Sequence, residues 1–327
     1  MGKRKYVAAV AAMGMLVLIL DSRTALSGGA QGVDLCLRTV IPSLFPFLYL
    51  SGCFSAAFAG TKLTGLHALG ELFFLPPGSE YLMIPAFLGG YPIGAQSVAQ
   101  AYDSGNIQKE RAERLLAYCS NVGPAFLFGM TANQFGQKYF TWESWAIQIF
   151  SAWTAARLFG YREDSPGPAR QSSGQPTFGI ESALWAMLKI CGWILLFRIV
   201  AAFLERWFLW ATAPWIRVSV IGLLELANGC CCLNQIVDEG LRFVICNALL
   251  AFGGLCVAYQ TASVCGKLNL RYYCAGKLLQ GAVALVLAVG VYYRLWYLFP
   301  IWFASSLLIP KALKKTVEIP RSVVYNH

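Results

Sequence analysis

The sequence predicts an all-α polytopic membrane protein with two repeated halves, whose broken helices or re-entrant hairpins meet at the bilayer midplane. Of its 327 residues, 57% are hydrophobic and only 13% are charged, whereas a soluble domain carries about 25% charged residues. One helical crossing takes roughly 20 apolar residues, so the chain has room for about eight crossings. The other two observations are a polar stretch at mid-chain and a glycine motif that occurs on both sides of it.

The residue inventory argues against an enzyme, a metal site and a bound cofactor. The only two histidines are His67 and His327, so neither a histidine metal cluster nor a Ser-His-Asp triad can be assembled. No nucleotide-binding P-loop is present, which argues against direct ATP coupling. The eleven cysteines lie in or beside apolar segments, where a free cysteine behaves as a small hydrophobic residue.

Charge placement predicts a multi-pass protein of the cell membrane. The formal net charge is +10, and basic residues gather beside apolar segments, as at residues 3–5. This is the positive-inside pattern, with some attraction to anionic lipid. The expected partners are therefore the lipid bilayer and a small-molecule solute rather than nucleic acid, and the pattern leaves a homo-oligomer open.

The first half, residues 1–160, contains five apolar segments. They lie at 6–20, 33–58, 81–102, 111–135 and 142–161. The first is interpreted as a crossing or signal anchor, with a cleaved signal peptide as the alternative. In the second, Pro42 and Pro46 predict a kinked or broken helix. The glycines and prolines of 81–102 favour a re-entrant hairpin.

A polar linker at 161–181 separates the halves, because this stretch is rich in proline, glycine and charge. The second half, residues 182–327, has apolar segments at 182–204, 207–233, 241–264 and 272–299. Glu225 lies inside the second of these. Arg198 lies inside the first, where it either reaches toward the membrane surface or pairs with a carboxylate.

A short motif repeats across the linker. Gly89-Gly90, followed by Gln96, aligns with Gly253-Gly254, followed by Gln260, and an aliphatic residue also matches between them. Arg114 and Lys277 then stand 18 and 17 residues after the two glutamines. The order and the near-equal spacing favour a real repeat over chance. For Arg114 and Lys277, the expected role is anchoring at the membrane surface.

Broken helices at membrane depth indicate a transport site. Backbone groups in hydrocarbon must be bonded internally, so a break survives only inside protein or beside water, and transporters build their sites from such breaks. The alternative is that the glycines only allow close helix packing. The candidate substrate-binding residues are Gly89, Gly90, Tyr91, Pro92, Gly94, Gln96, Asn121, Gly123, Pro124, Glu225, Asn228, Gly229, Gly253, Gly254 and Gln260.

Glu225 is the most specific single candidate. It follows an apolar run and precedes Asn228-Gly229, and carboxylates inside membranes usually face a cavity or a proton path. It would carry a coupling proton or orient the solute. The alternative is a shallow position, where the side chain simply reaches headgroup water.

Four motifs together resemble the YlbJ-type sporulation integral membrane proteins, within the wider nucleoside-recognition or gate domain group. They are Pro42-Ser-Leu-Phe-Pro-Phe47, Gly89-Gly-Tyr-Pro-Ile-Gly-Ala95, Glu113-Arg-Leu-Leu116 and Asn121-Val-Gly-Pro-Ala-Phe-Leu-Phe-Gly129. The resemblance covers roughly residues 33–290. It implies a permease that carries dipicolinate during sporulation, which would place the protein in a forespore membrane. Leu255-Cys256 replaces Tyr91-Pro92 in the second half, so a less sharp break is expected there.

These observations favour a secondary transporter for a small anionic organic solute. Relatives within the gate group have other roles, so a nucleoside-type transporter stays open. A non-transporting membrane protein of sporulation assembly or signalling is the alternative from another class. Under this alternative, the glycines can be replaced by other small residues without loss of function, and a substitution of Glu225 has no functional effect.

Overall fold

The computed structural model describes residues 2–58, 61, 63–131, 134–160, 179–295, 297, 300 and 302. Within these ranges the regular elements are all helical, which confirms the predicted all-α class. The first half contains α1 (Gly2–Leu20), α2 (Ser22–Leu35), α3 (Ile41–Phe58), α4 (His67–Leu72), α5 (Ile93–Asp103), α6 (Lys109–Leu115), α7 (Pro124–Thr131) and α8 (Tyr139–Phe159). The second contains α9 (Ile180–Leu204), α10 (Pro214–Leu224), α11 (Leu226–Cys231), α12 (Glu239–Phe252), α13 (Gly254–Cys265) and α14 (Arg271–Tyr292).

Short tighter or wider turns extend or join these helices. The π-helical turns are η1 (Cys36–Val40), η4 (Pro85–Gly89) and η5 (Glu205–Leu209), and the 3₁₀ turns are η2 (Thr64–Leu66), η3 (Glu80–Leu82) and η6 (Leu233–Gln235). π-helical turns are rare and often lie at functional sites. Two of the three are continuous with a long apolar helix: η1 precedes α3, and η5 follows α9.

Four helical stretches among the described residues are long and apolar enough to cross a membrane. They are Ser22–Phe58, Ile180–Leu209, Glu239–Cys265 and Arg271–Tyr292. Two shorter apolar helices, Lys5–Leu20 and Pro214–Leu224, accompany them. By length and composition, these helices are those of a membrane-associated protein. The number of crossings and the repeat of the two halves stay predictions.

Of the kink or break expected at Pro42 and Pro46, the break does not occur. The chain is helical without interruption from Ser22 to Phe58, and Pro46 lies inside α3. A proline ring clashes with the carbonyl four residues earlier and removes one backbone donor. Here the wider π-helical turn η1 ends at Val40, two residues before the first proline. This turn changes the backbone spacing without ending the helix.

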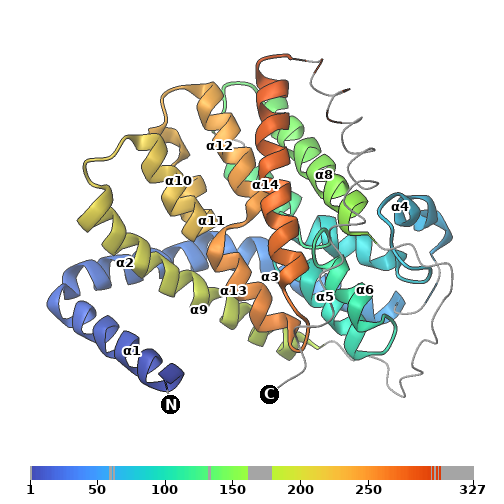
Figure 1. Cartoon of the computed structure of the whole chain (residues 1–327), viewed down its shortest axis with the longest axis horizontal. Helices are drawn as coiled ribbons and strands as arrows, with labels where there is room; N and C mark the ends of the chain where they lie inside the picture. The colour runs from blue at the N-terminus through green and yellow to red at the C-terminus, as the bar shows by residue number, and fades with distance from the viewer. Residues whose placement is uncertain are drawn as a thin grey trace.

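The long helices pack in two directions. In Figure 1, α2–α3 and α9 run across the lower part of the molecule, whereas α8, α10, α12 and α14 stand above them. Small residues bring α2 and α9 together, because a Cβ placed on Gly28 would lie 2.9 Å from the Ala202 Cβ. Close contact through small residues is the usual packing mode of helices in lipid.

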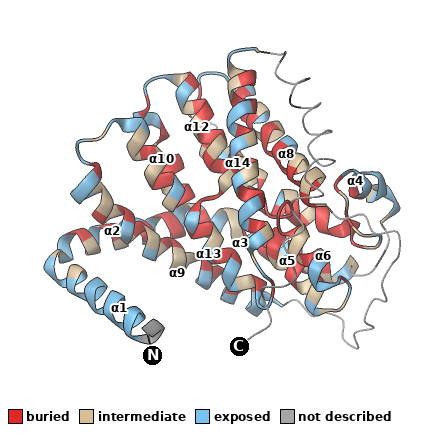
Figure 2. Cartoon of the chain, viewed as in Figure 1, coloured by how far each residue is buried: buried red, intermediate tan, exposed pale blue. Residues whose placement is uncertain are grey.

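Buried residues lie along α5, α8, α10 and α12, whereas α1 is mostly exposed and lies apart from them (Figure 2). The apolar side chains of α1 are mostly exposed, with Ile19 at 74% and Leu20 at 75%. Lipid would cover such a surface in a membrane. The choice between a crossing and a signal peptide for residues 6–20 stays a prediction. Most of the predicted linker, residues 161–178, and the basic tail from residue 303 lie outside the described residues.

Candidate transport site

Both Gly-Gly pairs interrupt a helix. The turn η4 ends at Gly89, and Gly90 has φ +83° and ψ −179°, a region that only glycine adopts readily. In the second half, α12 ends at Phe252 and Gly253 takes a left-handed φ of +84°. There α13 resumes at once with Gly254, whereas α5 begins only at Ile93. The second break is therefore shorter, in line with the sequence difference between the two motifs.

The two breaks touch each other through one tyrosine. The Tyr91 hydroxyl lies 3.0 Å from the Leu250 carbonyl oxygen and 3.2 Å from that of Ala251, in the last turn of α12. A Cβ placed on Gly253 would lie 3.3 Å from the Tyr91 Cζ. The Gly-Gly motif of the first half is thus docked on that of the second half.

A third interruption lies between α6 and α7. The Asn121 side-chain amide donates to the carbonyl oxygens of Tyr118, at 2.8 Å, and Ala86, at 3.2 Å, which fixes this segment against η4. A Cβ placed on Gly123 would lie 3.0 Å from the Gly90 Cα. Pro124 then begins α7, a position that proline favours. The predicted break at Gly123-Pro124 is present.

A fourth interruption carries Glu225, which joins α10 to α11 in an extended conformation. The side chain is 2% exposed, so it does not reach solvent. Its two carboxylate oxygens accept from the Ala227 nitrogen at 3.1 Å, from the Asn228 nitrogen at 2.7 Å and from the Asn228 Nδ2 at 2.6 Å. The carboxylate therefore caps α11, and Asn228 holds it in place.

An inner cavity lies between these interruptions. Its polar lining is Tyr91 from the first half and Glu225 and Gln260 from the second, and Gly123 also lines it. The apolar lining comprises Val40, Leu44, Val122, Phe126, Ile190, Ile194, Leu226, Ala227 and Val257. A mostly apolar pocket with a few convergent polar groups is the usual form of a small-molecule site.

The inner cavity is small in this conformation. The volume open to the centre of a water molecule is about 40 Å³, and one water needs roughly 10–15 Å³ by this measure. The cavity therefore holds a few waters, and an organic solute enters only if the lining helices move apart.

The other candidates surround the cavity or lie away from it. Gly94 and Gly229 are packing positions, because added Cβ atoms would lie 1.9 Å from the Cys119 oxygen and 2.2 Å from the Gly222 Cα. Gly254 packs on the Gly222 carbonyl in the same way, at 2.9 Å. The lining of the cavity does not include Gly89, Pro92 or Gln96.

Sequence reasoning missed the role of Lys277, for which it predicted a place at the membrane surface. The side chain is 2% exposed, and its Nζ donates to the Tyr91 hydroxyl at 3.1 Å and to the Gln280 Oε1 at 2.8 Å. Within the described part of the chain, no carboxylate is within ion-pair distance of this Nζ. Because α14 begins at Arg271, Lys277 lies almost two turns inside the helix rather than at its start.

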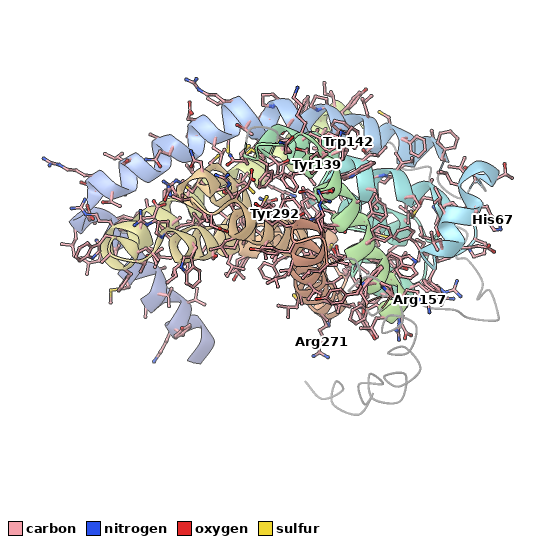
Figure 3. The ribbon with its side chains drawn as sticks, turned by 90° about the horizontal axis from the view of Figure 1, so that it is seen from above. His67, Tyr139, Trp142, Arg157, Arg271 and Tyr292 are labelled. Atoms are coloured by element: carbon pink, nitrogen blue, oxygen red, sulfur yellow. The ribbon has the colours of Figure 1, made fainter. Side chains whose placement is uncertain are left out.

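The two other basic residues discussed above are paired. Arg114 is an ion-pair partner of Glu110 at 3.3 Å and stacks 4.9 Å from the Tyr272 ring centre. Arg198 is an ion-pair partner of Glu205 at 3.1 Å. Of its two predicted roles, reaching toward the membrane surface or pairing with a carboxylate, the structure shows the second. His67 lies at the edge of the molecule in Figure 3, 3.5 Å from the carboxylates of Glu71 and Glu80, and it does not line the inner cavity.

Gly90→Ala is expected to destabilise the protein, whereas Gly129→Ala is not. A methyl group on Gly90 would lie 3.1 Å from the Gly123 nitrogen, and the backbone there has φ +83°. Such strain costs about 1–3 kcal/mol. Gly129 lies in α7 with nothing within 4 Å of an added Cβ, and alanine favours a helix. Thermal unfolding in detergent measures both changes, and equal midpoints for the two variants would contradict the strained break.

No family model, curated protein or solved structure matches the chain. The site is therefore defined by its own geometry. It has two glycine breaks that touch, a buried carboxylate and lysine, and a small cavity between the halves.

Proposed function

We propose that the chain is a secondary permease for a small organic anion, in a multi-pass arrangement in the cell membrane. One observation carries the proposal. The inner cavity is enclosed by interrupted helices from both halves, with Tyr91 and Gly123 on one side and Glu225 and Gln260 on the other. Transporters place their substrate sites at such an interface of interrupted helices.

The anionic character of the solute is inferred from Lys277. A buried charge is normally paired, because an isolated one is costly in a medium of low dielectric constant. Lys277 has neutral oxygen acceptors and the Tyr91 ring, whose centre lies 4.8 Å from its Nζ. Tyr91 lies between this amine and the inner cavity, and an anion bound there would favour the protonated form of the amine. An anion in the cavity would supply the missing countercharge.

The small volume of the cavity supports a mechanism of alternating access. A site that held an organic solute in a permanently open path would leak. The described conformation instead encloses room for a few waters, and rocking of one half against the other would open the site to each side in turn. The flexible points for such a motion are the four interruptions at Gly90, Gly123, Glu225 and Gly253.

The motif resemblance suggests dipicolinate as the solute and a forespore membrane as the location. A nucleoside-type transporter and a non-transporting role in sporulation assembly or signalling are the two alternatives. One uptake experiment separates dipicolinate transport from both alternatives, because the three functions differ in whether a solute crosses the membrane and in which one does.

We expect liposomes that contain the purified protein to take up dipicolinate or another dicarboxylate faster than protein-free liposomes. Ala227→Leu should abolish this uptake, because Ala227 lines the inner cavity and three added carbons would fill it. The control is Ala30→Leu, the same change at an exposed position of α2. Uptake of a nucleoside alone would support the nucleoside-type alternative. No uptake of any solute would support the non-transporting one.

A further inference from the structure

A second, larger hollow lies at the end of the molecule where α2, α9 and α10 converge, at the left of Figure 1. Its volume is about 670 Å³, which admits an organic solute, unlike the inner cavity. Four arginines from these elements and from η5 line it: Arg23, Arg198, Arg206 and Arg217. We call this site the arginine hollow.

The arginine hollow carries an excess of positive charge. Glu205 is the ion-pair partner of Arg198 at 3.1 Å, and Asp21 is that of Arg206 at 3.3 Å. Four arginines and two acids leave a net charge of +2. Among the described residues, Arg23 and Arg217 have no ion-pair partner, and Arg217 donates instead to the carbonyl oxygens of Trp210 and Thr212.

The hollow and the inner cavity share one face of α9 as a wall. Ile190 and Ile194 line the cavity, and Arg198, at the next four-residue step, lines the hollow. Residues four apart lie on the same face of a helix. Arg198 is 8% exposed, and its Nε has no hydrogen-bond partner. Its other two nitrogens donate to Glu205 and Gln31, which hold the guanidinium at the wall of the hollow.

We propose that the arginine hollow is an outer binding site that captures the anionic solute before it enters the inner cavity. This proposal rests on the proposed permease function. The ligand is a small organic carboxylate, because arginine forks bind carboxylate groups in two-point contacts. A basic hollow also raises the local concentration of anions and speeds their association.

Titration calorimetry on the detergent-solubilised protein tests the site, with dipicolinate, a planar dicarboxylate, as the probe. Arg23→Gln with Arg217→Gln should weaken binding by roughly tenfold at low salt, and the loss should shrink near 1 M salt, where the screening length is about 3 Å. Because Arg217 also holds backbone carbonyls, Arg23→Gln alone is the second variant, with a smaller loss. Arg271→Gln is the control, since Arg271 points away from the helices in Figure 3.

Each outcome decides the proposal. Weaker binding in the Arg23 variants but not in Arg271→Gln supports it, even if the parent protein transports nothing, which would overturn only the permease function. Parental binding in both Arg23 variants overturns it, even if uptake is normal. In nanodiscs, a response to phosphatidylglycerol over phosphatidylcholine that disappears in these variants, with unchanged dipicolinate binding, would assign the hollow to a lipid headgroup and overturn the proposal.

Discussion

Lys277→Met is expected to weaken the binding of an anionic solute by roughly tenfold, because the solute loses a nearby opposite charge rather than a direct hydrogen bond. Lys277 is the buried amine behind Tyr91, and its Nζ lies 3.1 Å from the tyrosine hydroxyl. Methionine keeps a similar length and fills the space without the charge. The Tyr91 hydroxyl keeps an acceptor in the Leu250 carbonyl oxygen, at 3.0 Å, so the junction of the two glycine breaks should survive.

The measurement is the concentration dependence of uptake for dipicolinate, with the uncharged diol of the same ring as a competitor. The loss should affect the anion and spare the diol, because only the anion interacts with the charge. Lys189→Met is the matched control. It removes the same charge from an exposed position on α9. Equal losses for the anion and the diol, together with a lower unfolding temperature, would show that Lys277 only stabilises the fold.

The positions of three of the four helix interruptions could be predicted from the sequence, because glycine and proline act locally, whereas the one at Glu225 was not predicted. Gly90 and Gly253 have positive φ values, and Gly123-Pro124 precedes α7. The same local rule predicted a kink or a break at Pro42, and the break is absent, because Pro42 follows a π-helical turn inside one continuous helix. A change in helix type over five residues leaves no clear pattern in side-chain chemistry, so it could not be anticipated.

The direction in which a charged side chain points could not be predicted. Lys277 and Arg114 occupy matched places in the repeated pattern, yet Lys277 is buried whereas Arg114 forms an ion pair with Glu110. One available signal was Gln280, three residues after Lys277 on an otherwise apolar helix. It accepts from Lys277 and donates to the Ala117 oxygen at 2.7 Å. Two polar residues on one face of such a helix indicate an inward-facing pair.

Glu225→Gln is expected to remove the pH dependence of uptake. Glu225 lines the inner cavity, and three N–H groups already occupy its carboxylate oxygens. A carboxylate is an acceptor only, and so is a fully ionised dicarboxylate solute. The two can approach each other closely only when a proton or another cation lies between them, and we expect that a proton does.

In the parent protein, uptake should therefore rise as pH falls, by up to about tenfold per pH unit, the slope for one coupled proton. Measurements above about pH 6 keep carboxylic solutes ionised, so the slope reports on the protein rather than on the solute. Glutamine cannot ionise, and uptake by the variant should be nearly constant over the same range. It should still bind the solute, because the charge that repels the anion is absent.

A loss of helix capping must be separated from a loss of coupling. Glutamine places an amide group where one carboxylate oxygen accepts from the Asn228 nitrogen or the Ala227 nitrogen, so part of the cap on α11 is lost, at a cost of about 1 kcal/mol. Glu225→Asp is the matched variant, because aspartate is a good capping residue and ionises. It should keep a pH slope even if its shorter side chain lowers the rate. If Glu225→Gln keeps the parental slope, Glu225 is a structural cap, and the coupling ion binds elsewhere.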